Sequence, residues 1–282
     1  MKIEVLLSTM HQADRSIIKK CNIHSDVVVI NQCDSSNEAE WKIGNEYRCK
    51  WIDSKDRGLS NSRNLAMKNA QGDICLLCDD DVVYKDEYCE IVKKAFDEIP
   101  DADVIVFDID EIGTSEKRTK AKKIHKLNRL KTYGSVHVAF KRECLASNNI
   151  SFDPLFGAGS NMYAMAEDAL LFREFAKKHI SVYVYPATIS TVYFESSTWF
   201  KGYNEKYFFD TGAYLQCAYP KLGRILMFYY PMRLHRKSEL SIREILRCIL
   251  LGMQGYKRKT CYDELKVNLN VERESKCNHS NV

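Results

Sequence analysis

The stretch Ile74-Cys75-Leu76-Leu77-Cys78-Asp79-Asp80-Asp81-Val82-Val83 decides the fold of this chain. Its apolar run predicts a buried strand, and three adjacent carboxylates stand where that strand ends. Neighbouring carboxylates repel one another and are costly at the mouth of a buried strand unless a positive group shares the site. A hard divalent cation is such a group, since it prefers oxygen ligands and often accompanies phosphates. An acidic turn that favours the start of the next helix is the alternative, and these residues alone do not separate the two.

The composition is that of a globular protein that can bury a substantial core. The chain has 282 residues, of which 45% are hydrophobic and 28% charged, as in ordinary soluble domains. Its eleven cysteines are scattered, and no arrangement typical of zinc is complete, so we expect reduced, buried thiols. The N-terminus begins a strand, without the pattern of a signal peptide. No segment reaches the ~18 apolar residues of a membrane span. We therefore expect a cytoplasmic protein, either free or peripheral on the cytoplasmic face of the membrane.

Strand and helix patterns alternate from the N-terminus to about residue 110. This alternation predicts an α/β fold with a mostly parallel sheet flanked by helices. The expected strands are residues 3–9, 26–30, 48–52, 74–78 and 103–107, and the expected helices are 12–21, 60–69 (capped by Ser60) and 86–98.

Polar residues follow other predicted strands as well as the aspartates. Ser8 and Thr9 end the first strand, and Asn31, Gln32 and Asp34 follow the second. Ligands of parallel sheets gather at the carboxyl ends of the strands. Three polar loops at one edge of the sheet therefore favour a binding site over chance helix capping.

The middle of the chain adds a second acidic group. Residues 136–140 predict a strand, and Phe156-Gly-Ala-Gly159 is a permissive loop. The apolar spacing after it predicts a helix over residues 166–175, with Glu167 and Asp168 in its first turn. Strands are expected at 182–185 and 189–194, and the rest is expected to be helical, aromatic and basic. An acid pair in a first helical turn is by itself usually structural.

In order and spacing, these segments resemble the GT-A-type glycosyltransferases of family 2, from about residue 3 to residue 210. The aspartates correspond to the family's DxD motif, and Glu167-Asp168 to its ED motif. The other matching segments are Val5-Leu-Leu-Ser8-Thr9, Gly58-Leu-Ser-Asn-Ser-Arg63-Asn64, Gly72-Asp73, Phe152-Asp153 and Phe156-Gly-Ala-Gly159.

The resemblance implies a GT-A-type, Rossmann-like domain with a helical, aromatic-rich C-terminal extension. Residues 1–112 would bind the nucleotide-sugar, and residues 113–212 would form the acceptor-binding and catalytic half. Residues 213–282 would be the basic, helical extension, with a poorly ordered tail. The activity implied is transfer of a sugar from a nucleotide-diphosphate donor to an acceptor hydroxyl, with inversion, as in bacterial surface polysaccharide biosynthesis.

The resemblance also assigns roles on the donor side. Asp81 would bind Mg²⁺ or Mn²⁺, and Asp79 would lie against the metal or the ribose. Asp80 is held in reserve, since the working pair of the three is not determined. Arg63 would reach the nucleotide, and Ser8 would lie in the turn that touches the base.

On the acceptor side, Asp168 would be the general base that deprotonates the acceptor hydroxyl, and Glu167 would orient the acceptor. Two departures from the family's pattern matter. Asn31-Gln32 stands where many relatives have an aspartate that reads the base, and an amide there leaves the base open. Tyr193-Phe194-Glu195-Ser196-Ser197 lacks the histidine that helps many relatives hold the metal. Either Glu195 substitutes for it or the metal has only one firm protein ligand, and we expect the latter.

The charge distribution suggests a further partner. Although the net charge is only +4, residues 117–131 carry eight Lys or Arg and no acid, and in residues 221–259 basic residues outnumber acids ten to two. Aromatic residues are dense from Tyr193 to Tyr230. Such features are often solvated helix faces and core, but a peripheral contact with an anionic membrane also explains them. A membrane contact would suit an acceptor saccharide that is linked to a polyprenyl diphosphate. A free saccharide is the other acceptor expected.

Two other functions are compatible with parts of the sequence. A sugar-1-phosphate nucleotidyltransferase also uses strand-end aspartates, but Ser8-Thr-Met-His-Gln12 lacks the expected glycine-rich phosphate loop. A non-catalytic basic binding protein would explain the lysine runs but leave the carboxylates unused. The near-neutral net charge argues against nucleic acid as its partner.

Overall fold

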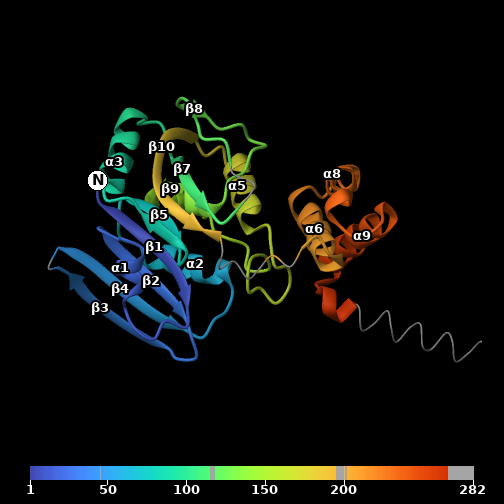
Figure 1. Ribbon diagram of the computed structural model, residues 1–282, viewed down its shortest axis with the longest axis horizontal. Coiled ribbons are helices and arrows are strands. Elements are labelled where there is room, and N and C mark those ends of the chain that lie inside the picture. Colours follow the sequence, from blue (N-terminus) through green and yellow to red (C-terminus); the bar gives the residue numbers. More distant parts are fainter. Residues whose placement is uncertain (45, 115–117, 195–199, 201, 266–282) are drawn as a thin grey trace, which may run out of the picture. The chain divides into compact units, whose positions relative to one another are not determined.

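The computed structural model describes residues 1–44, 46–114, 118–194, 200 and 202–265. Two compact units divide the chain. We call Met1–Pro154 with Glu167–Ser197 the N-terminal unit, and Leu155–Ala166 with Thr198–Val282 the C-terminal unit. Figure 1 shows the sheet of the first and the helices of the second. The predicted poorly ordered tail falls on residues 266–282, which lie outside the described residues.

The N-terminal unit is built on one twisted mixed sheet in the order β3-β4-β2-β1-β5-β9-β7-β10-β6. β4, β2, β1 and β5 are joined in parallel, as are β7 and β10. β9 runs antiparallel between β5 and β7 and joins these two parallel parts. The strands are β1 (Ile3–Met10), β2 (Asp26–Gln32), β3 (Asn37–Ile43), β4 (Tyr47–Ser54), β5 (Ile74–Asp79), β6 (Val82–Tyr84), β7 (Val104–Ile112), β8 (His125–Lys126, paired with β10), β9 (Val138–Lys141) and β10 (Val182–Tyr193).

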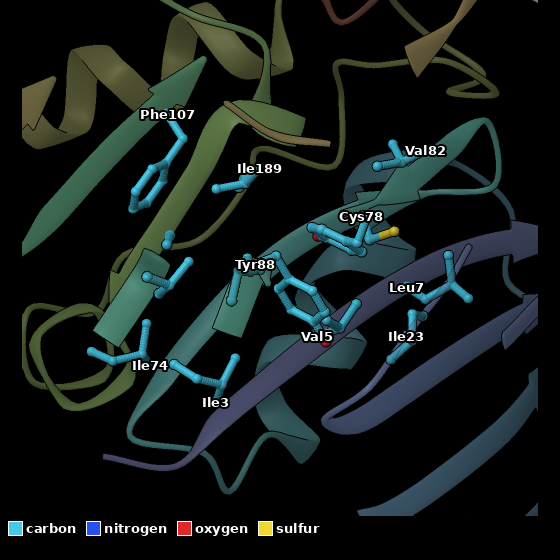
Figure 2. Close-up of a cluster of buried hydrophobic side chains, with 14 of the residues drawn as sticks. Ile3, Val5, Leu7, Ile23, Ile74, Cys78, Val82, Tyr88, Phe107 and Ile189 are labelled. Atoms are coloured by element: carbon cyan, nitrogen blue, oxygen red, sulfur yellow. The ribbon is translucent and has the colours of Figure 1, made fainter. Parts of the chain in front are cut away.

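Helices bury both faces of this sheet. Successive side chains of β1 alternate between two cores: Val5 and Leu7 join one, and Leu6 joins the other. Figure 2 shows the first core, where Tyr88 packs beside Val5. α1 (Ile17–Lys20) and α3 (Tyr88–Glu98) contribute to that core, and α2 (Leu59–Asn69), α4 (Arg142–Ser147) and α5 (Glu167–Lys177) to the opposite one. Burial on both faces explains why the middle of β1 (residues 5–7) and of β2 (residues 27–30) is an unbroken apolar run.

Several local predictions need correction. The helix expected over residues 12–21 is only α1, because Gln12 is held to the sheet edge: its backbone N–H donates to Asn31 at 2.9 Å. Ser60 does not cap α2, which begins one residue earlier after Gly58, whose φ of 104° suits glycine. The edge strand β3 was not predicted, and the two strands expected at 182–185 and 189–194 are the single strand β10.

The C-terminal unit confirms the predicted helical extension. Its helices are α6 (Glu205–Ala218), α7 (Gly223–Leu226), α8 (Tyr229–Leu234) and α9 (Ile242–Arg258). α6 and α9 approach so closely that a Cβ on Gly252 would stand 1.8 Å from the Phe209 carbonyl oxygen. The loop Leu155–Ala166 belongs to this unit, since Asp210 on α6 accepts the Ala164 backbone N–H at 3.0 Å.

No helix among the described residues is both long enough and apolar enough to cross a membrane. Cys75 and Cys78, which have CxxC spacing, are buried in β5 and free.

We predict that Gly252→Ala unfolds the C-terminal unit at lower denaturant. The added Cβ would meet backbone, which cannot yield as a side chain does, so the expected cost is about 3 kcal/mol. Urea unfolding followed by circular dichroism measures it. Gly134→Ala is the control, because its Cβ would meet nothing closer than 3.8 Å. Equal unfolding midpoints for the two variants would contradict the close packing of α6 and α9.

Candidate functional site

A buried arginine joins the two acidic motifs that the sequence singled out. The Arg63 side chain, in α2, is 3% exposed. Its Nη2 donates to both carboxylate oxygens of Asp79, at 3.1 and 2.9 Å, and Asp79 is the last residue of β5. Its Nη1 donates to Oδ1 of Asp168 at 3.2 Å and lies 3.6 Å from Oε1 of Glu167. We call Arg63, Asp79, Glu167 and Asp168 the Arg63 cluster.

The secondary structure explains why these four residues meet. β5 pairs with β1 so that Asp79 stands beside Ser8, at the carboxyl end of both strands. Glu167 and Asp168 open α5, where the first helical turn favours negative charge. α2 supplies the positive charge from the same face of the sheet as α5. The cluster therefore lies where ligands of α/β sheets bind.

Burial and mutual repulsion leave two of these carboxylates, Glu167 and Asp79, less acidic than usual. Burial, and then Asp168, raise the pKa of Glu167 to about 7, against the opposing effect of Arg63. Burial also raises the pKa of Asp79, although Arg63 partly offsets it. For Arg63 burial alone would lower the pKa, but Asp79 and then the acid pair outweigh it and raise the pKa. A guanidinium that remains charged is thus the condition for holding three carboxylates together.

The other two aspartates of the triplet have different surroundings. Asp80 accepts the Thr9 hydroxyl at 2.8 Å, and Thr9 in turn accepts the Gln12 side-chain amide at 2.8 Å. No ion pair reaches the Asp81 carboxylate within the described part of the chain. Burial, and then Asp79 and Asp80, raise the pKa of Asp81 to about 6. Asp81 is therefore the carboxylate of the triplet whose charge is least compensated.

This carboxylate chemistry fits a divalent cation that is completed by a ligand. Among the described residues, no group of three or more His, Cys, Asp or Glu side chains is arranged to hold a metal by itself. Both oxygens of Asp79 already accept from Arg63. Burial and then the repulsion from Asp79 and Asp80 raise the pKa of Asp81, and a cation at the site would favour its charged form. The residues thus fit a metal held by Asp81 and by oxygens of a bound phosphate.

A second polar group lies at the ends of β1, β2 and β4. Ser8 is buried and accepts a hydrogen bond from Ser62 at 2.8 Å. Asn31 is also buried, and its amide donates to Asp53 at 2.8 Å. The Trp51 indole N–H donates to the same Asp53 oxygen, also at 2.8 Å. Asn31 is thus held within the sheet edge, and Asp53, which is half-buried, is the group that it orients.

The comparisons with known proteins decide the family. The sequence profile described as "Glycosyl transferase family 2" matches residues 7–151. The chain belongs to this family. It is a glycosyltransferase, of the class that takes its sugar from a nucleotide-sugar, and the nucleotidyltransferase alternative is set aside. No curated protein sequence matches the chain.

Solved structures show the same GT-A fold for this glycosyltransferase. The crystal structure of S. aureus TarS 1-349 in complex with UDP-GlcNAc has a TM-score of 0.60 and 14% sequence identity, with 93% of each chain covered. That of TarS 1-349 with UDP has a TM-score of 0.59 and 16% identity, with the same coverage. Against the longer S. aureus TarS structure, the match covers 91% of this chain and 55% of TarS. The predicted fold class is confirmed.

The structure of the glycosyltransferase brings most of the predicted site residues to one edge of the sheet. Arg63, which was expected to reach the nucleotide, forms ion pairs with carboxylates of the protein. Asn31 is hydrogen-bonded to other residues of the protein. Sequence reasoning missed Asp53 as a member of the site, although it follows a predicted strand just as the aspartate triplet does. Glu195, the alternative to a metal with one firm protein ligand, lies outside the described residues.

We predict that Glu167→Gln changes how stability depends on pH. With a folded pKa of about 7 against an ordinary 4.5, Glu167 binds more protons in the folded than in the unfolded state between these values. The free energy of unfolding of the wild type therefore falls as pH rises through this window, by up to ~3 kcal/mol. The glutamine variant has no carboxyl group at this position, so its free energy of unfolding should not fall in this way. The difference in stability between variant and wild type should therefore shift in favour of the variant as pH rises. Thermal melts across the window measure it.

Glu174→Gln is the matched control, because Glu174 is on the same helix but lies nearer the surface, 2.6 Å from Lys177. Its effect should be much smaller. Parallel profiles for wild type and Glu167→Gln would show that Glu167 takes up no extra proton on folding.

Proposed function

We propose that the enzyme transfers a sugar from a nucleotide-diphosphate donor to a hydroxyl of a saccharide or lipid-linked acceptor, with inversion of the anomeric centre. The observation that carries the proposal is the Arg63 cluster, which places the ED acid pair beside the end of the DxD strand. A base near a diphosphate site suits in-line displacement of the nucleotide. Such a reaction would fit the biosynthesis of surface polysaccharides.

Asp168 is our candidate for the general base, and Glu167 for the residue that orients the acceptor. The Asp168 side chain is 28% exposed and that of Glu167 is 13% exposed, so Asp168 is the more accessible to a substrate. Arg63 contacts Oδ1 of Asp168 and thereby fixes the carboxylate. Oδ2 has no hydrogen-bond partner among the described residues, so it can accept the proton of the acceptor hydroxyl.

Asp81 is our candidate metal ligand, with Mg²⁺ or Mn²⁺ as the ion. The metal would supply neutralisation of charge on the departing nucleoside diphosphate. Asp79 would lie beside it, while Arg63 holds both Asp79 oxygens in place. Asp80, fixed by Thr9, would support the loop that carries Asp81.

The donor nucleotide would lie against the ends of β1, β2 and β4. Ser8 would contribute to the turn that touches the base, and Asn31 would act through Asp53, which it orients. A carboxylate accepts hydrogen bonds from the N–H groups of a base. Because S. aureus TarS is solved with UDP-GlcNAc, UDP-sugars are the first donors to test.

The acceptor is proposed to be a saccharide, either free or carried on a polyprenyl diphosphate. The predicted peripheral contact with an anionic membrane would bring the enzyme to the second kind. That contact would be made by residues of the C-terminal unit.

We predict that UDP-GlcNAc hydrolysis by the purified enzyme requires a divalent cation and falls about 10²-fold in Asp81→Asn. The amide keeps the size of the side chain but removes the charge that would bind the ion. Released UDP is measured with Mg²⁺, with Mn²⁺ and with EDTA. Asp97→Asn, an exposed aspartate on α3, is the control. Full activity in EDTA would remove the metal from the proposal.

We predict that Asp168→Asn lowers turnover by 10²- to 10⁴-fold, within the range of about 10²–10⁴ for loss of a general base, and leaves UDP binding intact. Calorimetric titration with UDP measures the binding, and UDP release from UDP-GlcNAc measures the turnover. Glu167→Gln serves as the comparison, since it alters the neighbouring carboxylate. If Glu167→Gln abolished turnover while Asp168→Asn retained it, the two roles would be exchanged.

A further inference from the structure

The C-terminal unit exposes an unusual run of large apolar side chains. Ile225 is 68% exposed, Phe228 54% and Met232 78%. The other large apolar side chains exposed in the same short stretch are Leu222, Leu226 and Tyr229. Contiguous apolar surface of this kind marks a binding surface, because isolated exposed residues are common but clusters are rare. We call residues 221–237 the basic apolar segment.

The exposed residues form the outer face of the helices α7 and α8. Leu222, Met227 and Phe228 have helical backbone angles, so helical turns continue between the two elements. The inner positions Gly223, Met227, Pro231 and Leu234 are buried. On a helix that faces water the opposite side is normally polar. Here the opposite side is apolar at Ile225, Phe228 and Met232, so both faces need an apolar environment.

The charges of this segment all have one sign. It carries five Lys or Arg and no Asp or Glu: Lys221, Arg224, Arg233, Arg236 and Lys237. No ion pair reaches Arg224 or Arg236 in the described part of the chain. Arg233 lies over the Tyr229 ring, 5.8 Å from its centroid, and donates to its hydroxyl at 2.6 Å. An amphipathic Tyr with an Arg beside it is typical of the level where a bilayer meets water.

We propose that the basic apolar segment docks the protein on the surface of an anionic lipid bilayer. A helix that lies in the interface buries apolar side chains among the lipids while its basic residues face the headgroups. Basic residues near an anionic surface add electrostatic attraction. A second copy of this chain is a poor occupant, because a symmetric contact would bring positive segments together. The docking does not depend on the reaction proposed above.

The test is co-sedimentation of the full chain with vesicles of phosphatidylcholine, with and without phosphatidylglycerol. The wild type should bind the vesicles that contain phosphatidylglycerol and not those of phosphatidylcholine alone, and added salt should weaken binding. The double variant Ile225→Ser/Met232→Ser should bind about tenfold more weakly or worse. Arg224→Glu/Arg236→Glu should lose binding through charge alone.

Leu130→Ser is the matched control, since Leu130 is 77% exposed, almost as much as Met232, but lies in the N-terminal unit's basic stretch. Its binding should equal that of the wild type. An equal loss in Leu130→Ser, wild-type binding by the Ile225/Met232 variant, or no binding by the wild type would each overturn the proposal. So would a dimer in sedimentation velocity without vesicles that the Ile225/Met232 variant abolishes. Circular dichroism melts confirm that each variant is folded.

Discussion

The contact of the Arg63 guanidinium with carboxylates from two other elements is the constraint on which the site depends. One buried positive charge reaches Asp79 at the end of β5 and the acid pair at the start of α5. Without it, three carboxylates would face one another in a poorly solvated space. A buried pair costs desolvation of each charge, and losing one partner leaves the others unpaired. Arg63 therefore holds α2, β5 and α5 in one arrangement as well as orienting the proposed base.

This constraint also divides the work among the three consecutive aspartates. Asp79 faces Arg63, and Asp80 is bonded to Thr9, so each already has a protein partner. Asp81 has no ion-pair partner among the described residues, and burial, followed by the charges of Asp79 and Asp80, raises its pKa. A cation with a diphosphate is the partner that would relieve this repulsion. The same local sequence thus supplies three carboxylates with different roles. Asp79 is structural, Asp80 supports the loop, and Asp81 favours a bound ligand.

The C-terminal unit is linked to the site through the chain. The loop Leu155–Ala166 belongs to that unit, where Asp210 holds Ala164, and Glu167 follows it directly. Ala166 has a φ of 79°, which costs a residue with a Cβ of the order of 1–2 kcal/mol. A strained junction thus separates a loop held by the helices from the acid pair. The unit that carries the basic apolar segment is therefore continuous with a catalytic element of the N-terminal unit.

The sequence by itself determined the alternating strands and helices of the first half, and it located the carboxylates at a strand end and a helix start. These are local features, since apolar periodicity and strand ends can be read along the chain. The antiparallel edge strand β3 escaped it, because its positions alternate between exposed and half-buried and it has no buried apolar run. Only the tertiary structure decided that Arg63 faces Asp79 and Asp168, the latter 105 residues away, and that Asn31 orients Asp53. Side-chain directions at a sheet edge are set by how the helices pack on it, which no local pattern encodes.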